Sequence, residues 1–273
     1  MKVYISVDIE GVTGITHWNE AGIGKPGYET FRDQMTAEAA AAAEGALAAG
    51  ATEILMKDAH WTARNLIAER LPEAVRLIRG WSGDPRNMLD EIDESFDAIV
   101  MVGYHSGAGC GGNPLAHTSN GKEFRMLING EVMTEFRLHS LMAAEMGIPT
   151  VFLSGDSLLC ETAKATGTGI HTVATTIGKG AATISIHPAR AIAAIRDGVE
   201  AALKDEAAHK TPALSDRYEL ELWFDKNADA YAASFYPGAS LCAPHAIRFE
   251  SERFFEIMRA LQFVFRSDLE FVA

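Results

Sequence analysis

The stretch Val3-Tyr4-Ile5-Ser6-Val7-Asp8-Ile9-Glu10-Gly11 joins a short apolar run to two acidic residues. Such a nearly continuous apolar run predicts a strand that is covered on both faces, as in a parallel sheet. Because a strand repeats its side-chain direction every second residue, we expect Asp8 and Glu10 to project to one side where the strand ends. Two neighbouring carboxylates repel each other unless they share a proton or a cation, so the stretch also indicates a metal site.

The same pattern, an apolar run that stops at polar residues, recurs three times. The runs are 53–57 before Asp58 and His60, 97–104 before His105, and 149–155 before Asp156. Segments with helical character lie between them, namely 28–49, 132–146 and 188–208. Strands that alternate with helices predict an α/β fold, with a mostly parallel sheet flanked by helices.

A change of pattern near residue 210 predicts a second, smaller part of the chain. Tyr218–Phe224 alternates polar and apolar residues, which is typical of a half-exposed strand. A further strand is expected at 243–250 and a closing helix at 251–266. We therefore expect an α/β metal-binding catalytic domain at 1–210 and a C-terminal α+β lobe at 211–273, packed together or as one compact domain.

Composition excludes several classes of partner. The chain has 273 residues, 48% of them hydrophobic, and 24 Lys and Arg against 37 Asp and Glu give a net charge of −13. This charge repels nucleic acid and anionic membrane surfaces. Three cysteines, Cys110, Cys160 and Cys242, are too few for a disulfide framework. No apolar stretch approaches the roughly 18 residues of a membrane span, and a strand at residues 2–7 leaves no room for a leader, so a cytoplasmic location is expected.

Acidic and imidazole side chains follow all four apolar runs. The carboxyl ends of parallel strands meet at one edge of a sheet, where ligands usually bind. Lys57 is the only basic residue among these strand ends, and strand alternation turns it away from Asp58. Mixed carboxylate and imidazole ligands suit zinc, manganese or iron better than calcium, and zinc is favoured. The residues expected at this edge are Asp8, Glu10, Asp58, His60, His105 and Asp156.

A glycine-rich segment, 106–114, is expected to form a loop beside this edge and leads to His117. An imidazole next to a metal centre can move a proton or stabilise an oxyanion at neutral pH. Cys110 lies in the same loop, but no paired base is recognisable, so a cysteine nucleophile is disfavoured.

The helix that follows the Asn129-Gly130 turn carries Glu131, Glu135 and His139. Glu135 and His139 are four residues apart and therefore lie on the same helix face. Either could complete a metal shell, and a hydrogen-bonded pair on the helix face explains the spacing equally well.

Taken together, these segments resemble the zinc D-aminopeptidases of the DppA type. The resemblance covers about the first 160 residues, and the Ser-x-Asp-x-Glu-Gly hexapeptide is its specific part. The matching segments are Ser6–Gly11, Asp58-Ala59-His60, Gly103-Tyr104-His105, Ala116-His117-Thr118, and Ile128-Asn129-Gly130 followed by Glu135.

The resemblance implies two zinc ions per subunit and a catalytic His117. It implies Asp8, Glu10, His60, His105 and Glu135 as the zinc ligands, and so selects Glu135 over its two neighbours. It also implies an aminopeptidase that releases the N-terminal residue of short peptides, such as D-alanine peptides, and a homodecameric assembly. The chain departs from the family pattern at 175–179, where a lysine and an arginine are usual, and at Ser157, where an aspartate is common. These departures bear on substrate specificity.

Two other functions remain open from the residues alone. A dinuclear site of this kind could instead hydrolyse another amide or a phosphoester. The loop at 107–114 supplies no Arg or Lys for a phosphate. A metal-bound binding protein is the other alternative, and it predicts a closed ligand shell without hydrolysis.

Overall fold

Alternate residues of the first strand, β1 (Lys2–Val7), pack against different layers of the molecule. Val3 and Val7 belong to an apolar core that they share with α2 (Tyr28–Ala48) and α5 (Pro188–Lys204). Tyr4 belongs to a second core, which includes residues of α3 (Glu135–Glu145) and α4 (Ser157–Lys164). The strand is therefore covered on both faces, as its apolar run predicts.

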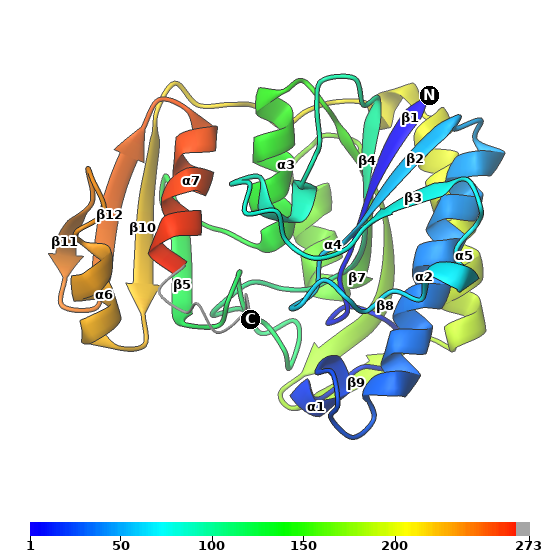
Figure 1. Ribbon diagram of the computed structural model, residues 1–273, viewed down its shortest axis with the longest axis horizontal. Helices are drawn as coiled ribbons and strands as arrows, with labels where there is room; N and C mark the ends of the chain where they lie inside the picture. Colours follow the sequence, from blue (N-terminus) through cyan, green and yellow to red (C-terminus); the bar gives the residue numbers. More distant parts are fainter. Residues whose placement is uncertain (266–273) are drawn as a thin grey trace.

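In the computed structural model, which describes residues 1–265, β1 lies inside a seven-stranded sheet (Figure 1). The strand order is β3-β2-β1-β4-β7-β8-β9, and all neighbours are parallel except the edge pair β8 and β9. The predicted α/β class with a mostly parallel sheet is confirmed. Besides β1, the strands are β2 (Glu53–Asp58), β3 (Val75–Ile78), β4 (Ala98–Tyr104), β7 (Thr150–Asp156), β8 (His171–Lys179) and β9 (Ala182–Ser185).

A second, antiparallel sheet lies beside the first (Figure 1) and has the order β11-β12-β10-β5-β6. Leu138 and Met142 of α3 belong to its core, whereas Phe136 belongs to a core of the first sheet, so α3 packs between the two. The strands and the helices of this part are β5 (Glu123–Ile128), β6 (Glu131–Val132), β10 (Tyr218–Phe224), β11 (Ser240–Ala243), β12 (Ala246–Ser251), α6 (Asn227–Ala233) and α7 (Phe254–Phe265).

Several predicted boundaries differ from those observed. The helix expected from residue 132 begins at Glu135, because residues 131–132 form β6 and the Thr134 hydroxyl caps the helix by accepting from the Arg137 amide. The strand expected at 243–250 is observed as β12 at Ala246–Ser251, and Ala243 instead ends the neighbouring strand β11. The closing helix, expected at 251–266, is described as α7 up to Phe265. Its expected last residue, Arg266, lies outside the described part of the chain.

The division into domains at residue 210 stays a prediction. Within residues 1–265, β10 pairs with β5, so the C-terminal strands share a sheet with a segment from the middle of the chain. The remaining elements are short: α1 (Trp18–Ala21) and 3-10 turns at Ala68–Arg70, Asn87–Leu89 and Glu206–Ala208. No helix in this described part is long and apolar enough to cross a membrane.

The chain after β1 folds tightly onto the end of β4. The Asp8 amide donates to the Val102 carbonyl at 2.8 Å, and the Gly11 amide donates to the Gly103 carbonyl at 2.8 Å. A Cβ atom at Gly11 would overlap the carbonyl of Tyr104, so only glycine fits there. This contact, at the point where the strand order reverses, brings the acidic pair beside the residues that follow β4.

Candidate metal centre

Three strand ends and one helix start bring a cluster of carboxylates and imidazoles together. Asp8 and Glu10 follow β1, His60 follows β2, His105 follows β4, and Glu135 is the first residue of α3. All five side chains are buried, with exposed fractions of 6% or less. The parallel-sheet edge predicted from the sequence is therefore the place where they meet.

Asp8 stands at the centre of the cluster, and its two oxygens face different partners. Asp8 Oδ1 lies 3.2 Å from His60 Nδ1, and Glu10 Oε2 lies 3.0 Å from the same nitrogen. Asp8 Oδ2 lies 3.3 Å from His105 Nε2, and Glu135 Oε2 lies 3.3 Å from that nitrogen. Asp8 is therefore shared by two sets, each of two carboxylates and one imidazole.

The histidines of the site, the two in the cluster and His117 beside it, are oriented by backbone carbonyls. In each ring the outer nitrogen pairs with a carbonyl oxygen, so it carries the proton and donates it. The inner nitrogen is then left with its lone pair directed at the cluster. The pairs are His60 Nε2 with Ala21 at 2.8 Å, His105 Nδ1 with Ser106 at 2.9 Å, and His117 Nδ1 with Leu115 at 3.0 Å.

The cluster contains buried polar atoms that no described residue satisfies. Glu10 Oε2 and His105 Nε2 are both buried and make no hydrogen bond within residues 1–265. A buried acceptor without a donor is costly, and a metal ion removes that cost because it takes lone pairs from both atoms. Two groups of three side chains each place their ligand atoms within 4.8 Å of one another. One group is Asp8, Glu10 and His105, and the other is His105, His117 and Glu135. The donor set therefore fits zinc.

The charges of the cluster favour a cation at its centre. Burial opposes charge on Asp8, but close contact with the rings of His105 and His60, and their charge, hold its pKa well below the usual range. Burial likewise opposes protonation of His60, but the charge of Glu10 and the bond to Asp8 raise its pKa well above normal. The pKa of His105 is raised in the same way, against burial, by Glu135 and Asp8. A divalent cation supplies this positive charge without protons.

His117 lies beside the cluster, at the end of the glycine-rich loop. Its ring stacks on that of His105, with centroids 4.4 Å apart and planes 10° apart. His117 Nε2 lies 3.7 Å from Glu135 Oε1, which accepts a hydrogen bond from the Ser119 amide at 2.7 Å. The imidazole is held at the edge of the metal-binding groups and is partly open to solvent.

Asp58 and Asp156, which were expected at the same edge, turn their carboxylates into loops. Asp58 accepts from the amides of Asn65 at 2.5 Å and Leu66 at 2.7 Å. Asp156 caps α4 and accepts from the amide and hydroxyl of Ser106, both at 2.6 Å. These two aspartates therefore shape the loops after β2 and β4 and take no part in the cluster.

The alternatives near α3 also lie outside it. His139 is buried, donates from Nδ1 to the Glu135 carbonyl at 2.7 Å, and has a pKa lowered by burial. Glu131 forms an ion pair with Arg137 instead. Burial raises the pKa of the Cys110 thiol, which keeps it protonated and poorly nucleophilic. Of the acidic and imidazole groups on this segment, Glu135 is the one that joins the cluster.

Four side chains of the cluster line a cavity of about 520 Å³ together with His117, namely Asp8, Glu10, His60 and Glu135. The volume is typical of small-ligand sites. Trp18, Trp61 and Trp81 also line it, and the sequence analysis missed them. Trp61 directly follows the Asp58-Ala59-His60 strand end, which was the available signal. Trp81 follows β3, a strand that was not predicted.

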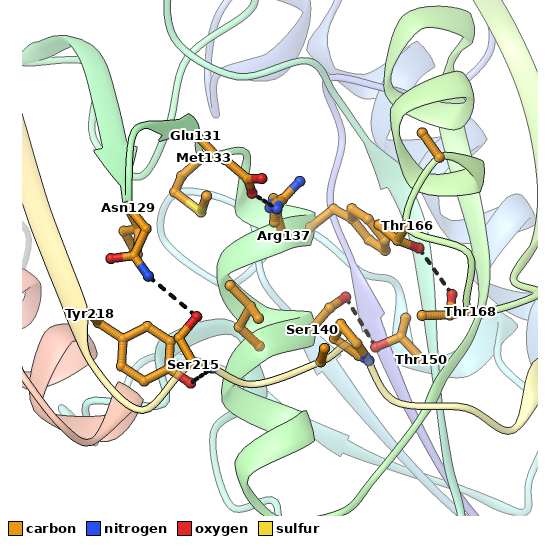
Figure 2. A pocket seen from close by; sticks show the side chains of 16 residues that line it. Asn129, Glu131, Met133, Arg137, Ser140, Thr150, Thr166, Thr168, Ser215 and Tyr218 are labelled. Carbon is orange, nitrogen blue, oxygen red and sulfur yellow. Dashed lines mark hydrogen bonds and ion pairs between the residues drawn. The ribbon is translucent and has the colours of Figure 1, made fainter.

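A second cavity, of about 420 Å³, lies along another part of α3 (Figure 2). Its polar side chains pair with one another. In the part of the chain that the structure describes, both groups of side chains able to hold a metal lie at the first cavity, which all their members except His105 line. The pairs in the second cavity are Arg137 with Glu131, Asn129 with Ser215 at 3.3 Å, Ser140 with Thr150 at 3.2 Å, and Thr166 with Thr168 at 3.1 Å (Figure 2).

Glu123, the first residue of β5, is a buried carboxyl near the site that the sequence analysis also missed. Its exposed fraction is 3%. Burial raises its pKa to about 8, and the charge of Glu135 adds to the shift. The side chain is therefore neutral at neutral pH.

Replacing Glu123 with glutamine is expected to stabilise the fold increasingly between about pH 5 and pH 8. The folded carboxyl keeps its proton up to a pKa of about 8, whereas the unfolded one ionises near 4.5. The wild type therefore loses up to about 1.4 kcal/mol of stability per pH unit across this window, and the amide loses none. Thermal unfolding in chelator at several pH values measures the difference. Glu53→Gln, at an exposed position, is the control, and equal pH slopes for the Glu123 variant and wild type would contradict the assignment.

Comparison with known proteins gives one consistent answer. The model of the peptidase M55 family, described as D-aminopeptidase, matches residues 1–263. A D-aminopeptidase of Bacillus subtilis (strain 168) is 28% identical over 266 residues, which cover 96% of this chain and 95% of the relative. A solved structure, described as Zn-dependent D-aminopeptidase DppA from Bacillus subtilis, a self-compartmentalizing protease, matches with a TM-score of 0.91 and 25% identity. The match covers 98% of this chain and 100% of that chain.

Proposed function

We propose that this chain, which belongs to the peptidase M55 family of D-aminopeptidases, binds two zinc ions per subunit and removes N-terminal D-residues from short peptides. Its function as a zinc-dependent aminopeptidase follows from the family and from its match to a zinc-dependent relative. That membership selects the aminopeptidase over the phosphoesterase and the binding protein. The number of ions, the D-configuration of the substrate and the roles of single residues are the proposed part.

The division of Asp8 between two histidines is the observation that carries the proposal of two ions. One zinc ion would be held by Asp8, Glu10 and His60, and the other by Asp8, His105 and Glu135. Each set provides three protein ligands, which leaves a position open for water or substrate, as catalytic zinc sites require.

Zinc bound there supplies a Lewis acid and lowers the pKa of a bound water to near 7. The chain itself holds and orients the reacting groups. The carbonyl of Leu115 fixes the His117 ring so that Nε2 faces the cavity, where it can donate a proton to the leaving amine or a hydrogen bond to the oxyanion.

Small peptides and a homo-oligomer are the proposed partners. The solved relative is described as self-compartmentalizing, which supports an assembly of several subunits, and the family resemblance implies a homodecamer. An acidic chain of net charge −13 gives no support to nucleic-acid or membrane binding. A monomeric mass in sedimentation would contradict the proposed assembly. The cytoplasmic location is also a proposal.

Zinc dependence and substrate chirality can be tested in one experiment. We expect the zinc-loaded protein to release amino acid from D-aminoacyl amides and dipeptides faster than from their L counterparts, because the family acts on D-residues. Chelation should abolish release and zinc should restore it, with about two ions per subunit measured by mass spectrometry of the metal. Release of amino acid from the L series alone, or no release from either series, would contradict the proposal.

A further inference from the structure

The cavity above the metal-binding groups has an aromatic wall. Three of the four tryptophans in the chain line it, and Met88 lies among them. Trp18, Trp61 and Trp81 are 49%, 41% and 38% exposed, which is unusual for side chains of this size. Exposed aromatic area that gathers around a cavity indicates contact with a ligand.

Trp81 is held in place from behind by a buried charge. Lys57 is fully buried, lies 3.8 Å from Asp90, and donates to the carbonyl of Gly80. Its ammonium lies 4.2 Å from the centroid of the Trp81 ring, a cation–π contact that is strong in a desolvated site. This contact offsets part of the free-energy cost of burying the lysine, and it holds the indole of Trp81 at the cavity.

Trp61 is positioned by its neighbours as well. The Trp81 indole Nε1 donates to the Trp61 carbonyl at 2.7 Å, so the two residues are linked. Trp61 has a φ of 43°, a backbone conformation that a bulky residue rarely adopts. A Cβ atom at Gly22 would lie 2.9 Å from the Trp61 ring, so only a glycine leaves room for the indole. Such a strained and supported arrangement is typical of a binding wall.

The size of the cavity decides which substrates this wall fits. A volume of about 520 Å³ is far larger than the methyl group of an alanine residue, which would touch little of the aromatic surface. A phenylalanine-sized side chain would bury apolar area against the indole rings and displace water from them.

We propose that the cavity walled by Trp61 and Trp81 binds a bulky apolar side chain next to the scissile bond, so that this enzyme prefers aromatic over alanyl peptides. The inference rests on the proposed function and names the substrate class of the same site. It follows from the buried Lys57, the indole hydrogen bond and Gly22 of this chain.

Matched dipeptides test the preference in the zinc-loaded wild type. The panel is alanyl-alanine, phenylalanyl-alanine and alanyl-phenylalanine, in whichever stereochemical series the enzyme hydrolyses. We expect kcat/KM to be about tenfold to a hundredfold higher for one of the phenylalanine peptides than for alanyl-alanine. The phenylalanine peptide with the higher kcat/KM shows which side of the scissile bond the wall contacts. No gain at either position would overturn the inference.

Variants of the wall provide the second test. Trp61→Ala and Trp81→Ala should each lower the phenylalanine-to-alanine ratio of kcat/KM by about fivefold or more, because an aromatic contact is lost. A variant that merely folds poorly loses both substrates together, so the ratio isolates the contact. Trp81→Phe should keep most of the preference, and Trp223→Phe, in the second sheet, should change nothing.

The outcomes separate this inference from the proposed function. Zinc-dependent hydrolysis of alanyl-alanine without any aromatic preference would agree with the proposed aminopeptidase function and would overturn the inference about the tryptophan wall. No zinc-dependent hydrolysis of any peptide would overturn the function itself. An unchanged ratio in both alanine variants, together with a changed assembly size, would assign the tryptophans to a subunit contact and also overturn the inference.

Discussion

Replacing Asp8 with asparagine is expected to lower kcat/KM by about three powers of ten or more and to reduce bound zinc from the proposed two ions per subunit to one or fewer. The two oxygens of Asp8 lie 3.2 Å and 3.3 Å from the inner nitrogens of His60 and His105. An amide keeps the shape of the side chain but offers one oxygen, so one of the two sets loses a ligand. Metal analysis of the purified variant and its peptide hydrolysis rate are the measurements.

Two further variants make this prediction specific to a bridging carboxylate. Glu10→Gln removes a ligand from the His60 set alone, so it should cost one zinc ion. Asp97→Asn removes a carboxylate at the opposite end of the sheet, where it accepts from the Lys2 amide, and should retain zinc and activity. If the Asp8 variant keeps both ions and wild-type turnover, the dinuclear assignment is wrong.

The core of the site was predictable because it depends on one rule of parallel sheets. Polar residues that follow apolar runs lie at a common edge, and this rule placed Asp8, Glu10, His60 and His105 together before any contact was known. The rule says which edge a residue reaches. It does not say which way a side chain turns once the strand has ended.

That limit explains why two of the predicted aspartates hydrogen-bond to loops and do not take part in the cluster. Asp58 and Asp156 were predicted at the edge and lie there, but backbone amides of 65–66 and 106 took their oxygens. The positions of those amides depend on the paths of irregular loops, which have no sequence periodicity. The choice of Glu135 over His139 was equally beyond the spacing argument, since residues four apart share a helix face. Family resemblance, rather than spacing, supplied it.

The second sheet shows a different limit. The alternating pattern at Tyr218–Phe224 predicted a strand correctly, and that strand pairs with β5. Their antiparallel pairing joins segments about ninety residues apart, as Leu220 with Ile128 shows. Alternation describes one strand and its buried face, but it carries no information on the partner. Fold class was therefore predictable, and the path of the chain between the two sheets was not.

Replacing His117 with alanine is expected to lower kcat by about two to four powers of ten while both zinc ions are retained. His117 is near enough to Glu135 and His105 to be taken for a ligand, because its Nε2 lies 3.7 Å from Glu135 Oε1. The five assigned ligands already account for the two sets around Asp8, however, and the His117 ring stacks on His105 instead of completing either set. Zinc content and turnover should therefore separate in this variant.

Chemical rescue distinguishes a proton-transfer role from a loss of structure. Imidazole added to the alanine variant should restore part of the turnover, because removing the side chain leaves space within the cavity that His117 lines. His209→Ala, at an exposed position outside the cavity, should match wild type in both zinc and rate. A fall in zinc content in step with turnover would make His117 a ligand, whereas unchanged turnover would remove it from the mechanism. Because a ligand role predicts loss of zinc and a proton-transfer role predicts its retention, one purified variant decides between them.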